Sequence, residues 1–159
     1  NESIKNILEQ SKTEIEENQR QAKLTFAKAL IASMTHMAVI DNEFAAEEER
    51  EIMDAISNFP EFKDELNNIH TAIKATKNEN NQVFNYLNEA RKELSSEALI
   101  NILAQAAVVL LADGSIEKEE EDLMKEYLIA CGLPKEMYQT LIDRLQQKDI
   151  SELQEGQLN

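Results

Sequence analysis

Two acid-rich segments have the chemistry to bind a hard cation. Residues 41–51 hold six carboxylates against one Arg, and residues 113–122 hold six against one Lys. Each segment has an Asp just after an apolar stretch and a Glu seven residues later. Crowded carboxylates are costly to ionise together, and a bound cation relieves that cost. Oxygen ligands select ions such as Ca²⁺ or Mg²⁺ over zinc or copper.

A purely structural interpretation of the same acids stands beside the metal interpretation. If Glu117 is the N-cap of a helix, Glu120 is its third residue, and its carboxylate can accept the N-cap amide as in a capping box. Glu48 stands in the same relation to Ala45. Acidic residues are also favoured in the first turn of any helix by the helix dipole. The residues alone leave both interpretations open.

The calcium site of an EF-hand is excluded by the spacing. Counted from Asp113, the sixth and twelfth positions are Lys118 and Met124, where that loop needs Gly and Glu. The copy that starts at Asp41 fails at the same two positions. Any calcium site in this chain is therefore of a different construction.

No other group of residues predicts catalysis. His36 and His70 lack the Glu three residues earlier that di-iron helical bundles use. A single His on an apolar helix, as at His36, is more often packed than ligating. Cys131 ends an amphipathic segment with no basic neighbour in sequence, which predicts a buried, unreactive thiol. We expect a protein that is not an enzyme.

The acid-rich segments belong to an internal duplication that organises the chain. Asp41 aligns with Asp113 and Glu48 with Glu120, a period near 72 residues. An apolar, alanine-rich helix precedes each acidic turn. Few Gly and Pro and much Ala, Leu, Glu, Lys and Gln predict an all-α bundle of seven to eight helices. The expected parts are a polar N-terminal helix (1–19), one domain (20–148) made of two halves (about 20–76 and 82–148), and a tail (149–159).

Composition bounds the partners. A net charge of −15 argues against nucleic acid and anionic membrane, which are bound by clustered Lys and Arg. One cysteine allows no internal disulfide, and no apolar run reaches the roughly 20 residues of a membrane span. No signal peptide is visible. We expect a soluble, cytoplasmic protein that does not insert into a membrane.

The run Ala112-Asp113-Gly114-Ser115-Ile116-Glu117-Lys118-Glu119-Glu120, its partial copy at Asp41 and the alanine-rich helix before each resemble the TerB family of tellurite-resistance proteins over about residues 20–146. The first copy departs by having Asn42 in place of Gly, although Asn also tolerates the left-handed turn. The resemblance implies a duplicated helical fold and an acidic cluster that binds a divalent cation. Carried onto this chain, the ligands are Asp41, Glu48, Asp113 and Glu120, with Glu47 and Glu119 as second choices.

The resemblance also implies a role. The expected function is a non-catalytic stress-response protein that binds Ca²⁺, with Mg²⁺ as the alternative, and acts with other proteins of a complex that confers resistance to tellurite, phage and colicins. A rival of another class is a metal-independent acidic interaction module of co-chaperone type that docks a basic partner. A carboxylate-bridged metallohydrolase ranks last, because no histidine accompanies the acids. Whether each half has its own site or the two share one stays open.

Overall fold

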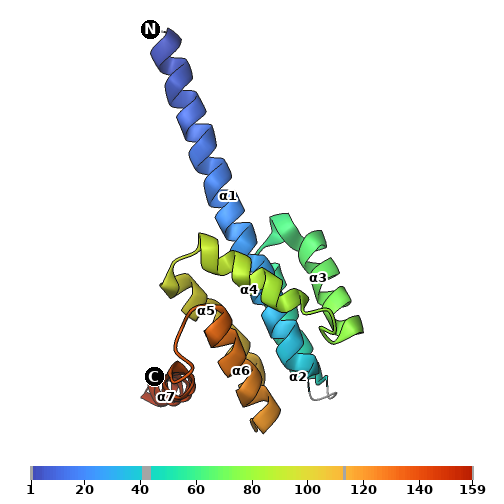
Figure 1. The fold of residues 1–159 in the computed structure, drawn as a ribbon. Coiled ribbons are helices and arrows are strands. Elements are labelled where there is room, and N and C mark those ends of the chain that lie inside the picture. Colours follow the sequence, from blue (N-terminus) through green and yellow to red (C-terminus); the bar gives the residue numbers. More distant parts are fainter. Residues whose placement is uncertain (1, 41–43, 113, 159) are drawn as a thin grey trace.

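The computed structural model describes the backbone of residues 2–40, 44–112 and 114–158, and the side chains of residues 3–40, 44–112 and 114–147. This described part contains α-helices and one 3₁₀ turn, and no strand. The elements, in chain order, are α1 (Glu2–Val39), α2 (Ala46–Ser57), η1 (Pro60–Phe62), α3 (Lys63–Thr76), α4 (Gln82–Glu93), α5 (Ser96–Leu111), α6 (Lys118–Ala130) and α7 (Met137–Leu158). The predicted all-α fold is confirmed (Figure 1).

Helix α1 is the axis of the molecule. Its C-terminal half is surrounded by α2, α3, α4 and α5, all of which pack against it. From Leu24 onward the helix is mostly buried, as expected of an apolar helix inside a helical body. The largest fully buried side chains come from both halves of the chain: Ile31, Met34, Met37, Ile52, Leu66, Ile73, Leu87, Ile102, Leu103, Leu110, Met124 and Tyr127. The two halves therefore share one core.

The N-terminal part of α1 departs from the prediction. We expected a polar N-terminal helix over residues 1–19 that is separate from the domain beginning at residue 20. The structure has one continuous helix of 38 residues, and residues 3–21, here called the arm, project away from the body (Figure 1). No Gly or Pro interrupts the sequence there, so the helix continues where burial stops.

Helix ends follow local chemistry. Ser95 caps α5 by accepting the amide of Ala98 at 3.2 Å. The seam between the halves contains Lys77, Asn78 and Asn81 in the left-handed region, at φ 54°, 61° and 58°. α7 begins at Met137, three residues after Pro134, and it runs to Leu158, into the predicted tail (149–159).

Two further features of the helices concern their polarity. α5 is the apolar helix predicted before the second acidic turn, and Asn101 and Gln105 leave one of its faces exposed. Among the helices described, none is both long and apolar enough to cross a lipid bilayer.

Candidate metal site at two repeated helix junctions

The starts of α2 and α6 have the same local geometry. Glu48 Oε1 accepts a hydrogen bond from the backbone amide of Ala45 at 3.0 Å, and Glu120 Oε1 accepts one from the backbone amide of Glu117 at 2.9 Å. The two N-cap residues have matching backbone angles, φ −78° and ψ 153° at Ala45 and φ −79° and ψ 157° at Glu117. The duplication inferred from sequence is therefore visible as a repeated structural device, in which the third helical residue caps its own helix.

Both capping carboxylates are almost completely buried. Glu48 is 2% exposed and Glu120 is 1% exposed, which is rare for a carboxylate in a protein. Burying a charge is costly unless hydrogen bonds and favourable dipoles compensate. The N-cap amide and the helix N-terminus supply part of that compensation. Each carboxylate is thus held in one place at the junction.

The other predicted ligands fare differently. Asp41 and Asp113, with the neighbouring residues 42 and 43, lie outside the described residues, so the Asp–Glu pairings have no geometry here. The second-choice ligands Glu47 and Glu119 lie exposed in the first turns of their helices. Within the residues that the structure describes, no group of three or more His, Cys, Asp or Glu side chains is arranged to hold a metal ion.

The first junction has an anchor that sequence reasoning missed. Both carboxylate oxygens of Glu49 lie 3.1 Å from Nε2 of the buried His70, and Lys74 Nζ lies 3.6 Å from Glu49 Oε2. Phe44, at the junction itself, packs against the His70 ring at a tilt of 48°, and Lys74 Nζ lies 4.4 Å from the Phe44 ring centroid. α3 therefore ties down the start of α2. No sequence pattern pairs residues 49 and 70.

The second junction is anchored otherwise. Glu121, which matches Glu49, has Lys125 Nζ at 3.3 Å, one turn along the same helix. This pair is half exposed and is worth little by itself. The two junctions are thus alike in their caps but differ in how the neighbouring acid is neutralised.

His36 is a core residue, as its apolar surroundings predicted. It lies on α1 between α4 and α6, where Tyr127 donates its hydroxyl hydrogen to Nδ1 at 2.6 Å and Asn78 Nδ2 lies 3.4 Å from the same atom. Asn78 in turn accepts the amide of Val83 at 3.0 Å. Burial lowers the pKa of His36 to about 4, so the ring is neutral at pH 7.

Cys131 is buried, as predicted, but it has a basic neighbour that the sequence did not reveal. Arg91 lowers the pKa of the thiol, while burial raises it more strongly, to about 11. The thiol is therefore protonated at neutral pH and a poor nucleophile.

Comparison with known families decides the identity of this fold. The model of the family described as tellurite resistance protein TerB matches residues 27–142. The chain belongs to the TerB family. No curated protein and no solved structure matches the chain. The TerB match contains both junctions with their capping carboxylates, and it leaves out the arm of α1.

Proposed function

We propose that this TerB protein binds a divalent cation at its acidic junctions, through Asp41 and Glu48 in one half and Asp113 and Glu120 in the other. Ca²⁺ is the expected ion and Mg²⁺ the alternative. The observation that supports the proposal is the nearly complete burial of Glu48 and Glu120, each in the first turn of a helix within an acid-rich segment. A carboxylate already held by its cap is preorganised, which lowers the entropic cost of taking a ligand.

The chemistry of the donors fits a hard cation. The side-chain oxygens near each cap are those of carboxylates, joined by the amide of Asn42 in the first segment and the hydroxyl of Ser115 in the second, and Ca²⁺ prefers such oxygen donors. Calcium takes six to eight oxygens, so backbone carbonyls and water would complete its shell. The cation would also offset the mutual repulsion of six carboxylates within each segment.

The proposed role is non-catalytic. The cation orders the two junctions, and the surface so formed is recognised by other proteins of a resistance complex. This role rests on family membership together with the acidic junctions.

Calorimetric titration with Ca²⁺ and Mg²⁺ tests the metal proposal, and Glu120→Gln is its sharpest variant. Gln keeps an oxygen that can accept the amide of Glu117 but removes the charge, so the helix cap survives while affinity falls at least about tenfold. Asp113→Asn should act in the same direction. Asp143→Asn, which alters an exposed acid on α7, is the matched control and should leave the titration unchanged. Titrations without heat for every protein would refute metal binding.

The metal-independent interaction module is the second candidate. It is favoured by the caps themselves, which account for both buried carboxylates through protein contacts. In that case, capture of a basic partner falls steeply with salt and does not respond to a chelator. Partner capture that requires Ca²⁺ would decide for the metal proposal instead.

A further inference from the structure

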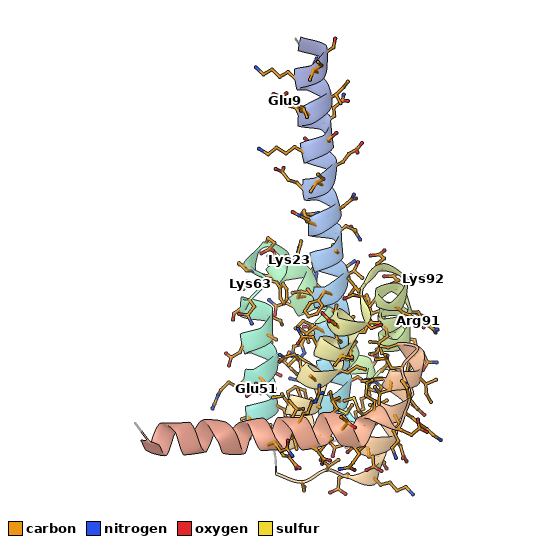
Figure 2. All side chains as sticks on the ribbon, turned by 90° about the vertical axis from the view of Figure 1, so that its left-hand side faces the viewer. Glu9, Lys23, Glu51, Lys63, Arg91 and Lys92 are labelled. Atoms are coloured by element: carbon orange, nitrogen blue, oxygen red, sulfur yellow. The ribbon has the colours of Figure 1, made fainter. Side chains whose placement is uncertain are left out.

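The arm of α1 exposes an apolar stripe to solvent. Ile4, Ile7, Leu8 and Ile15 are 57–65% exposed, and every residue from 3 to 21 is exposed. In Figure 2, Glu9 lies on the arm far from the rest of the chain, whereas Lys23 lies where the helix enters the body. Arg20, near the end of the arm, contacts the body at 5.3 Å from the Phe62 ring centroid, but the apolar stripe before it is left to solvent. Most helical stability in proteins comes from tertiary packing of such an apolar face. We therefore expect another surface to cover this apolar stripe.

The body offers a groove of matching character along the same helix. α2 and α5 both pack on α1, and a cleft of about 280 Å³ lies between them, with Phe26 and Leu30 of α1 among its lining residues. A second cleft of about 260 Å³ shares Glu51 with the first. The second cleft is otherwise apolar: Val108, Leu111, Ala112 and Leu145. The two clefts adjoin at Glu51, and together they are here called the α2–α5 groove.

The two clefts follow one another along the helices. The first contacts α5 at Asn101 and Gln105, and the second at Val108 through Ala112. At 1.5 Å per residue this stretch of α5 spans about 16 Å, or three helical turns. An elongated occupant such as a helix fits this shape better than a compact small molecule.

Charge selects the kind of occupant. Glu51 and Asp54 line the groove, and none of the described residues lining either cleft is basic. The arm has four Glu and three basic residues, a net charge of −1 in a chain of −15. Lys5 and Lys12 border the apolar stripe, one and four residues after Ile4 and Leu8 respectively. The arm thus combines apolar side chains, which match the apolar lining of the groove, with the basic side chains that its described lining lacks.

Symmetry makes the match reciprocal. Ile4, Leu8, Ile15, Ala22 and Phe26 follow one another at intervals of four, seven, seven and four residues, the spacing that keeps side chains on one side of a helix. The stripe of the arm therefore lies on the side of α1 that reaches the groove at Phe26. Two copies related by a two-fold axis perpendicular to α1 bring each arm onto the other copy's groove, which closes the assembly as a dimer.

We propose that this protein forms an antiparallel dimer in which the arm of each copy lies in the α2–α5 groove of the other. Lys5 and Lys12 then face the groove carboxylates Glu51 and Asp54. The two-fold axis passes near residue 20, midway between the arm and the groove.

Sedimentation of the full chain over a range of concentrations tests the dimer. Leu8→Glu combined with Ile15→Glu should weaken dimerisation at least about tenfold. Asn6→Glu combined with Thr13→Glu places the same two charges, seven residues apart, on the opposite side of the arm and should leave it unchanged. A wild-type chain that stays monomeric at about 100 µM overturns the proposal. If that monomer binds a basic amphipathic peptide, the groove serves another protein instead.

Charge reversal tests the pairing of arm with groove. Lys5→Glu with Lys12→Glu, or Glu51→Lys with Asp54→Lys, should each weaken the dimer, and all four changes together should restore it to within about threefold. Restoration cannot result from misfolding. Failure of the combined variant to recover, with both pairs of changes still folded by circular dichroism, contradicts the pairing.

Distances between spin labels separate this dimer from one in which the arms pair only with each other. Labels at Asn6→Cys should lie about 42 Å apart, because each is about 14 residues from the axis, and labels at Gln21→Cys should lie much closer together. Cys131→Ala provides the background. Short Asn6 distances would show arm-to-arm pairing and overturn the exchange.

Discussion

Tyr127 and His36 join the two halves of the molecule through a buried hydrogen bond of 2.6 Å between the Tyr hydroxyl and Nδ1 of the imidazole. Tyr127 is on α6 and His36 is on α1, 91 residues apart in the chain. Phe84 of α4 packs against both rings, with centroids 6.5 Å from His36 and 5.6 Å from Tyr127. The shared core thus contains a polar contact that fixes how the halves meet.

The buried His36 makes the fold sensitive to acid. Its pKa is about 4 in the folded protein and 6.5 as an unperturbed group. As the pH falls, the unfolded chain therefore binds the proton at a higher pH than the folded protein does. His36 therefore costs no stability above pH 6.5, and stability falls as the pH drops from 6.5 to 4. The full loss is about 3 kcal/mol.

Urea unfolding of the wild type and of His36→Gln between pH 7.5 and pH 4.5 measures this loss. The variant is less stable at pH 7.5, but its stability should change less with pH, because Gln does not titrate. The carboxylates titrate in both proteins and cancel in the comparison. Parallel pH profiles for the two proteins would contradict the assignment.

Removing the Tyr127 hydroxyl should weaken the core without opening it. Tyr127→Phe deletes the donor to Nδ1, which keeps only the longer contact with Asn78. We expect a loss of about 1–3 kcal/mol in the free energy of unfolding, the cost of leaving a buried acceptor poorly satisfied. The half-buried Tyr86 supplies the control Tyr86→Phe, for which we expect less than about 0.5 kcal/mol.

Local rules predicted much of this fold. The all-α class, the boundary between the halves at residues 77–81 and the repeated junctions all depend on residues close in sequence. The contact of Glu49 with His70 was out of reach, because no short-range pattern links α2 to α3. The prediction divided α1 at residue 19 because the apolar pattern changes there, although a helix continues wherever no residue breaks it.

The candidate site shows a different limit. A Glu at the third helical position satisfies the pattern of a metal ligand and that of a cap equally well. The structure shows that Glu48 and Glu120 are caps. Their metal role stays a prediction, and the geometry of Asp41 and Asp113 lies beyond the described residues.

The two caps should be worth similar amounts. Glu48→Ala and Glu120→Ala each leave an N-cap amide without its acceptor, and we expect each to cost about 1–2 kcal/mol in the absence of metal. Glu48→Gln and Glu120→Gln retain an acceptor and should cost less. Chemical denaturation in the presence of a chelator measures all four. A Gln variant as unstable as its Ala counterpart would show that the charge, and not the cap, stabilises the junction.

The two left-handed glycines should respond unequally to substitution. Gly132 follows α6 at φ 75°, and a Cβ there would lie 2.7 Å from Arg91 Nε. Gly114 has φ 87°, and a Cβ there would meet no atom within 4 Å among the described residues. Both Ala variants pay the backbone strain of about 1–2 kcal/mol, but only Gly132→Ala must also displace the Arg91 side chain. We therefore expect Gly132→Ala to lower the melting temperature further than Gly114→Ala.

Combining Gly132→Ala with Arg91→Ala should recover the difference, since the guanidinium is then gone. Equal melting temperatures for the two single variants would show that Arg91 moves aside without cost.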